Sequence, residues 1–201
     1  MDLIANTYEY LWPGGPVMIP IILTSFCMWL LIVERVLYFR RMDKDDVSLK
    51  QAVQMLNQRP LQTALKGLRA GIVMNFLKER TKNNKLDTGI LKLCAMREKP
   101  HIRQFLTVIA VLAAISPLFG LLGTVTGMIT TFNVIALFGT GNAKAMAGGI
   151  SEALITTQSG LLVAIPGLFM SAFLIRRANR LERRLDELIL TLMRNIKKTG
   201  S

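Results

Sequence analysis

The chain has few of the side chains that usually build a reactive centre. Among its 201 residues there are one histidine, two cysteines and only 13 acidic residues, against 25 lysines and arginines. His101 alone cannot form a metal site, and Cys27 and Cys94 lack the spacing of metal ligands or of a pair. There is no P-loop, nucleophile elbow, zinc motif or dinucleotide fingerprint. The sequence therefore predicts a protein that is not an enzyme and needs neither a cofactor nor a metal.

Charge is also missing from a long internal stretch. No residue between Arg103 and Lys144 is charged, and this run far exceeds the roughly 18 apolar residues that indicate a membrane-spanning helix. Hydrophobic residues make up 51% of the chain, which is typical of an integral membrane protein. Asp2 and Glu9 precede the first basic residue, Arg35, so we do not expect a cleavable signal peptide at the N-terminus.

Three segments are long and apolar enough to cross a bilayer, and they predict an all-α membrane protein. We expect spans at residues 17–39, 105–138 and 149–175. The second span is longer than the hydrocarbon core requires, because a helix rises about 1.5 Å per residue. The remaining parts are an N-terminal segment at 1–16, a helical region at 40–104, a turn at 139–148 and an amphipathic helix at 176–201.

The basic residues predict the orientation of these spans. Most lysines and arginines lie in residues 40–103 and 176–201, whereas the N-terminal segment has none and the turn has only Lys144. The positive-inside rule then places the two basic regions in the cytoplasm, and the N-terminus and the turn in the periplasm. Contact with anionic membrane lipid explains the net charge of +12, so no nucleic-acid partner is expected.

The last helical segment carries an apolar stripe. Its large apolar residues recur at three- and four-residue spacing, which is typical of an amphipathic helix; they are Leu181, Leu185, Leu188, Leu192 and Ile196. We expect a neighbouring subunit to cover this stripe.

Glu152 is an ionisable residue within the third span, where a charge costs at least about 2.5 kcal/mol. Thr156 and Ser159 follow on the same face of the helix, and Thr157 lies beside that face. Three interpretations remain open from these residues. The polar side chains form hydrogen bonds that hold helices together, or they line part of a hydrated path for protons or ions. Because Glu152 is near the start of the span, it could also be an interfacial carboxylate.

The second span contains the small residues Gly120, Gly123 and Gly127 together with several threonines, including Thr124. The four-residue step from Gly123 to Gly127 allows close approach of another helix. A threonine hydroxyl can bond to the backbone of its own helix. Threonines therefore indicate a pore only in combination with the carboxylate on the next span.

Two runs of residues resemble the signatures of the MotA/TolQ/ExbB proton-channel family. Residues 120–128 read GLLGTVTGM, and residues 148–157 read GGISEALITT. Their order and spacing match the family over about residues 105–180, with the greatest similarity to its ExbB members. Thr126 and Gly148 depart from the pattern, since many members have tryptophan and proline at these positions.

The resemblance implies a pentameric bundle around a central pore in the bacterial inner membrane, with the second and third helices extending into the cytoplasm. It implies an ExbD-like single-span partner with an essential aspartate, and a TonB-like protein that receives work derived from the proton motive force. By position, Thr124 and Thr157 are pore-lining threonines and Glu152 is the family's carboxylate. Thr156 joins them in the proton pathway, and the helix-packing residues are Gly120, Gly123, Gly127 and Gly160.

Other functions remain open. Within the family, the chain could be a TolQ-like subunit or another stator, although a flagellar-type subunit would be expected to have four spans. From a different class, a self-contained channel or a membrane scaffold would also account for three spans and a polar face.

Overall fold

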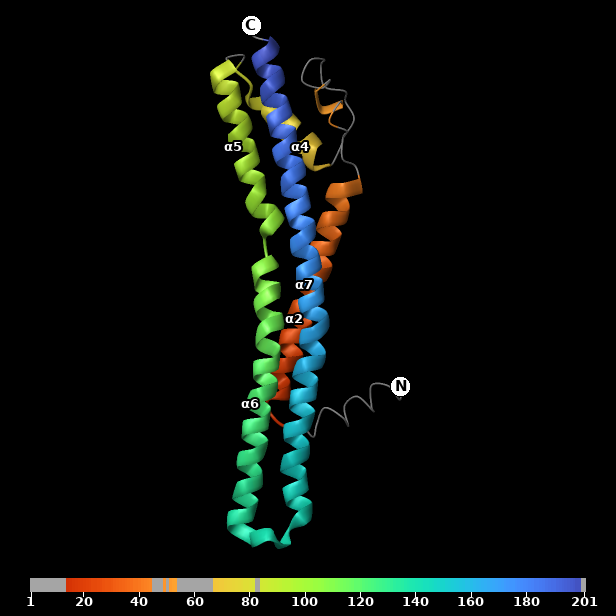
Figure 1. Ribbon diagram of the computed structural model, residues 1–201, viewed down its shortest axis with the longest axis vertical. Helices are drawn as coiled ribbons and strands as arrows, with labels where there is room; N and C mark the ends of the chain where they lie inside the picture. Colours follow the sequence, from red (N-terminus) through yellow and green to blue (C-terminus); the bar gives the residue numbers. More distant parts are fainter. Residues whose placement is uncertain (1–13, 45–48, 50, 54–66, 82–83, 200–201) are drawn as a thin grey trace. The chain divides into compact units, whose positions relative to one another are not determined.

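The computed structural model describes residues 14–44, 49, 51–53, 67–81 and 84–199, and the regular structure in these ranges is helical. The elements shown in Figure 1 are α2 (Met18–Lys44), α4 (Leu68–Glu79), α5 (Asn84–Arg103), α6 (Leu106–Phe138), the short 3-10 helix η2 (Gly139–Gly141) and α7 (Ala143–Thr199). Three helical stretches of the described chain are long and apolar enough to cross a membrane, namely Met18–Asp43, Leu86–Gly141 and Ala143–Ile196. The all-helical fold with three potential spans is therefore confirmed.

The connection between α6 and α7 is shorter than predicted. The chain leaves α6 at Gly139, whose φ of 65° is accessible mainly to glycine. The amide of Ala145 donates to Oδ1 of Asn142 at 3.1 Å, as in a helix N-cap. Because this cap starts α7 at Ala143, the predicted turn at residues 139–148 is too long and residues 143–148 are helical.

A break at Phe105 separates α5 from α6. Phe105 has a φ of 62°, a conformation that bulky side chains rarely adopt. The buried side chain of Arg35 lies against this break. Its guanidinium is 5.3 Å from the centroid of the Phe105 ring and donates to the carbonyl of His101 at 2.9 Å. These contacts stabilise the irregular backbone between the two helices.

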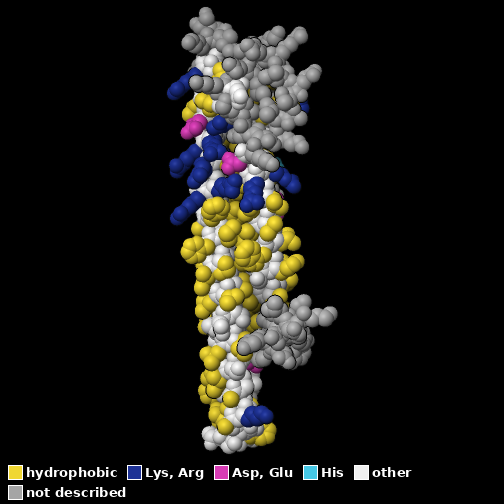
Figure 2. All heavy atoms as spheres, turned by 90° about the vertical axis from the view of Figure 1, so that its right-hand side faces the viewer, with side chains coloured by type: hydrophobic (Ala, Val, Ile, Leu, Met, Phe, Trp, Pro, Cys, Tyr) yellow, Lys and Arg dark blue, Asp and Glu magenta, His cyan; other side chains and the backbone are white. Residues whose placement is uncertain are grey.

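The chain divides into two compact units, and both α2 and α7 contribute residues to each. The first unit comprises Met1–Ile32 and Thr107–Ala172, and the second comprises Val33–Leu106 and Phe173–Ser201. In the first unit, many large apolar side chains are exposed, including Leu137 and Phe169 at 77% each. Hydrophobic side chains accordingly cover much of the face in Figure 2. Such a surface is typical of contact with lipid or with other subunits.

The second unit has a conventional leucine core. All five residues of the stripe on α7 are at most 3% exposed; they are Leu181, Leu185, Leu188, Leu192 and Ile196. Ion pairs connect α5 with α7, and α4 packs against α5. The stripe is therefore covered within the chain itself. The prediction that a neighbouring subunit would cover it was wrong, because the stripe is already buried by other residues of the same chain.

Candidate functional site

The candidate site lies in the first unit, where α6 packs against α7. Gly120 and Gly160 face each other there: a Cβ atom added to Gly160 would lie 3.0 Å from the Cα atom of Gly120 and 2.7 Å from the carbonyl oxygen of Ser116. A Cβ atom added to Gly120 would lie 3.1 Å from the Cα atom of Thr157. Side chains do not normally approach backbone atoms this closely, so glycine allows the two backbones to touch.

Two further glycines extend this contact along α6. A Cβ atom on Gly123 would overlap the side chain of Thr156, and one on Gly127 would lie 2.7 Å from the carbonyl oxygen of Gly149 and 2.9 Å from Cβ of Ala153. The four glycines expected from the sequence to pack helices all lie at this contact. With no room for larger side chains, the polar groups of α7 are held directly against the backbone of α6.

The threonine hydroxyls at the contact all donate to backbone carbonyls. Thr156 is buried and donates within α7, to the carbonyls of Glu152 and Ala153 at 3.0 and 2.9 Å. Thr157 donates to Ala153 at 3.0 Å and, across the contact, to the carbonyl of Gly120 at 3.3 Å. In the structure, these hydroxyls thus satisfy their own hydrogen-bonding capacity within α7, and the hydroxyl of Thr157 also links α7 to α6.

Thr124 meets Thr157 through a shared carbonyl. The hydroxyl of Thr124 donates to Leu121 at 2.6 Å, and in α-helical geometry the amide of Thr124 uses the carbonyl of Gly120 as its acceptor. The hydroxyl of Thr157 reaches the same carbonyl. The structure therefore brings together Thr124 and Thr157, which are far apart in the sequence, and it leaves both side chains partly exposed.

Glu152 lies one to two turns from the threonines on α7 and is half-buried. Its side chain packs against the backbone of Gly15, where an added Cβ atom would overlap the carboxylate. Gly15 has a φ of 67°, which other residues rarely adopt. In the described part of the chain, the Glu152 carboxylate has no hydrogen bond or ion pair.

Sequence reasoning gave several residues no role in this contact. Gly149, Ser116 and Thr131 all lie where α6 and α7 touch. The signal was present in the sequence, because the small residues of α6 recur at three- and four-residue steps from Ala113 through Ser116 to the glycines and Thr131. Gly15 carried no such signal, since its contact with Glu152 joins distant parts of the chain.

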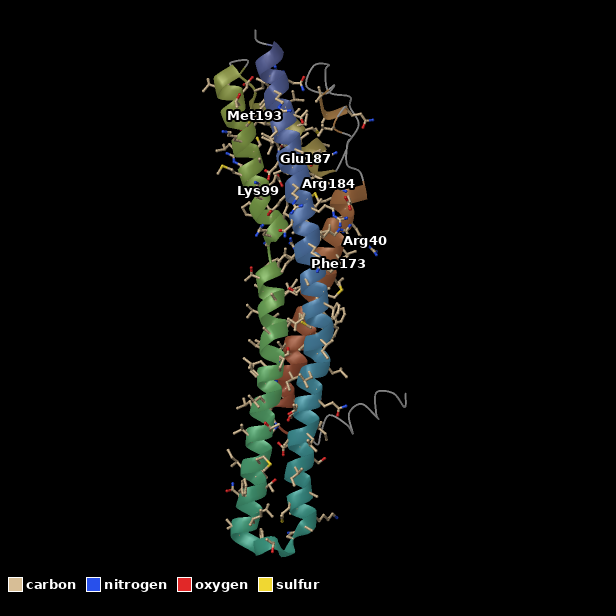
Figure 3. The ribbon with its side chains drawn as sticks, viewed as in Figure 1. Arg40, Lys99, Phe173, Arg184, Glu187 and Met193 are labelled. Carbon is tan, nitrogen blue, oxygen red and sulfur yellow. The ribbon has the colours of Figure 1, made fainter. Side chains whose placement is uncertain are left out.

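In the second unit, ion pairs between α5 and α7 accompany the leucine core. Arg103 donates to the carboxylate of Glu182 at 2.6 and 2.8 Å and also to Asn179 at 3.3 Å. This hydrogen bond holds the pKa of the Glu182 carboxyl below its ordinary value. Lys99 pairs with Asp186 at 2.8 Å, and the position of Lys99 on α5 can be followed in Figure 3. Among the described residues, no group of histidine, cysteine and acidic side chains is arranged to hold a metal.

Comparison with known proteins agrees with the order of these elements and motifs. The model of the MotA/TolQ/ExbB proton channel family matches residues 52–187. This match covers more than half of the chain, so the chain belongs to that family, whose members are proton channels and not a known class of enzymes.

The curated relatives point to one branch of the family. An ExbB-like biopolymer transport protein of Synechocystis is 33% identical over 81% of this chain and 68% of its own length. The biopolymer transport protein ExbB of Neisseria meningitidis is 31% identical over 86% of this chain and 89% of its own length. ExbB of Aquifex aeolicus is 42% identical over 40% of this chain and 53% of its own length. The chain is ExbB-like, and it is a multi-pass protein of the inner membrane.

Proposed function

We propose that the chain is a stator subunit that conducts protons together with a partner helix and converts the proton motive force into mechanical work. The observation that carries the proposal is the hydrogen bond from Thr157 to the carbonyl of Gly120, which brings Thr157 next to Thr124. Glu152 lies on the same helix without a described partner, about 7.5 Å away along the helix axis. One wall of a proton path is thereby present in a single chain.

The hydroxyls have a chemistry suited to this role. Each hydroxyl has one proton to donate and two lone pairs to accept. Thr124 and Thr157 donate to backbone carbonyls, so their remaining capacity is to accept. They would therefore stabilise water or a protonated carboxylic acid in the path. Thr156, which is buried against Gly123, would hold the wall in place beside them.

Glu152 would act near the entrance of the path. A carboxylate without a paired cation attracts positive charge and raises the local concentration of protons. Its position against Gly15, before the start of α2 at Met18, puts this negative charge near the start of α2. In this position Glu152 would tune the field, set ion selectivity or relay protons.

A complete path requires other proteins. We propose that five copies of the chain surround a pore and that an ExbD-like single-span partner contributes the aspartate that is protonated. Movement of the complex would be passed to a TonB-like protein for import across the outer membrane. The partner aspartate would be the acid that is protonated and released in step with movement, while Glu152 would act near the entrance of the path.

We propose the orientation from the distribution of charge and the helix lengths. The connection at Gly139–Gly141 and the N-terminus would face the periplasm, and the arginine-rich part of α7 would face the cytoplasm. Because α6 has 33 residues, it is about 50 Å long and exceeds a hydrocarbon core of about 30 Å. The basic helix α5 before α6 and the arginine-rich continuation of α7 would place the extensions of both spans in the cytoplasm.

The test is to replace the polar residues one at a time in cells that carry the ExbD-like and TonB-like partners. Thr124→Ala, Thr157→Ala and Glu152→Ala should each reduce uptake of an iron complex at least about tenfold at equal protein level, because each removes part of a proton path. Thr130→Ala is the matched control, since Thr130 is exposed and its hydroxyl donates to the carbonyl of Thr126 in its own helix. Full uptake in all three variants would overturn the assignment.

Two alternatives predict different results. A TolQ-like subunit would restore function in cells that lack a Tol system and not in cells that lack ExbB. A self-contained channel would conduct protons when the purified chain alone is placed in vesicles. Since Thr124, Thr156 and Thr157 all donate to backbone, we expect no flux from the chain alone and measurable flux once the partner is added.

A further inference from the structure

A cavity of about 450 Å³ in the second unit is lined mainly by arginine. It lies between α7 and the end of α2. Its charged residues are Arg176, Arg177, Arg180, Arg184 and Asp43. The arginines follow one another at steps of one, three and four residues, which places them on one side of α7. Figure 2 shows Lys and Arg side chains gathered on one stretch of the surface, and Figure 3 shows Arg184 and Phe173 on α7.

Asp43 organises two of the four arginines. Its carboxylate accepts a hydrogen bond from Arg177 at 3.1 Å and another from Arg184 at 2.7 Å. Both carboxylate oxygens are thus engaged. Arg176 and Arg180 have no carboxylate partner among the described residues. Among the described residues, the lining of the cavity therefore has four arginines against one carboxylate, which is an excess of positive charge.

The chemistry of this lining selects a phosphate group. The guanidinium group is planar, is always charged and presents paired N–H donors that match the oxygens of a phosphate. Arginines on successive turns of a single helix can contact different oxygens of one phosphate. Asp43 disfavours a second anion close to Arg177 and Arg184, so Arg176 and Arg180 are the expected ligands.

An apolar residue at the same cavity distinguishes a lipid from a free anion. Phe173 lines the cavity and is 53% exposed. It lies near the end of the predicted span at 149–175. A free phosphate gains nothing from contact with an apolar ring, whereas the glycerol and upper acyl chain of a phospholipid would bury the ring of Phe173 and remove it from water.

We propose that this cavity binds the phosphate headgroup of an anionic phospholipid, with Arg176 and Arg180 contacting the phosphate and Phe173 contacting the lipid chain. The site is separate from the α6 and α7 contact of the proposed proton path and does not depend on that function. It would anchor the end of α2 and the middle of α7 at the cytoplasmic surface of the membrane, where anionic lipids are abundant.

The experiment titrates three ligands into the purified full-length chain in neutral detergent and measures binding by native mass spectrometry. The ligands are phosphatidylglycerol, phosphatidylcholine and inorganic phosphate. Arg176→Gln combined with Arg180→Gln should weaken phosphatidylglycerol binding about 30-fold, given about fivefold for each basic residue near a lipid phosphate. Arg183→Gln combined with Arg194→Gln removes the same charge from exposed positions of α7 outside the cavity, and should weaken it less than about threefold.

Phe173→Ala separates the two sources of phosphate, because it should weaken phosphatidylglycerol and leave inorganic phosphate unchanged. If the double variant does not fold, as judged by circular dichroism, Arg180→Gln alone should still weaken binding about fivefold. An equal loss in the control pair would show diffuse charge and overturn the proposal. Binding of inorganic phosphate as tight as that of phosphatidylglycerol, or equal binding of phosphatidylcholine, would also overturn it.

Discussion

The two units of the chain solve the same problem of helix packing with different chemistry. In the first, α6 and α7 touch through glycine, and the polar side chains of the contact donate to backbone carbonyls. In the second, α7 buries a leucine stripe and forms ion pairs with α5 and α2. Lipid does not drive apolar side chains together, so packing there relies on close backbone contact. Water does drive them together, which favours a leucine core.

The largest effect on stability is expected when a leucine is removed from the core of the second unit. Leu185 is completely buried, so Leu185→Ala should lower the free energy of unfolding by about 2–5 kcal/mol through lost burial and a new cavity. Leu190→Ala on the same helix is the control, because Leu190 is 58% exposed. Thermal unfolding of the purified chain would measure both. Equal effects would show that the leucine stripe does not hold this unit together.

The second prediction concerns the first unit, where adding apolar surface should destabilise. Gly123→Leu would force a side chain into Thr156, and overpacking of this kind costs about 1–3 kcal/mol. Gly148→Leu makes the same change on α7 where nothing lies within 4 Å of the added Cβ atom. We expect aggregation on heating in detergent to begin earlier for Gly123→Leu than for Gly148→Leu. The reverse order would contradict close contact of α6 with α7.

The smallest effect should be a pH dependence confined to the second unit. Because the Arg103 hydrogen bond lowers the pKa of the Glu182 carboxyl from its ordinary 4.5, the folded state binds fewer protons than the unfolded state in this pH range. The stabilisation is present above the unfolded pKa and is lost as the pH falls through the lower folded pKa. As the pH is lowered from about 6 to 3, the melting temperature of the wild-type chain should fall more steeply than that of Glu182→Gln. Glu187→Gln, at an exposed position of α7, should behave like the wild type.

Much of the candidate site could be predicted because its residues recur within single helices. Gly123 and Gly127 are four residues apart, as are Glu152 and Thr156, and helical periodicity places each pair on one face. What could not be predicted is which carbonyl each hydroxyl would use. Thr157 was expected in a polar stripe, but its bond to Gly120 depends on how α6 meets α7. Charge pairs such as Asp43 with Arg184 likewise depend on packing.

The sequence alone determined that three apolar helices exist, because an uncharged run from residue 104 to residue 143 and the spans on either side of it require a membrane. It also determined the small-residue faces and the family motifs, since these are local patterns. The tertiary structure decided that the leucine stripe is covered within the chain, that Glu152 lies against Gly15 and that four arginines line one cavity with Asp43. These features join residues far apart in the sequence, and periodicity within one helix carries no information about which surfaces of different helices meet.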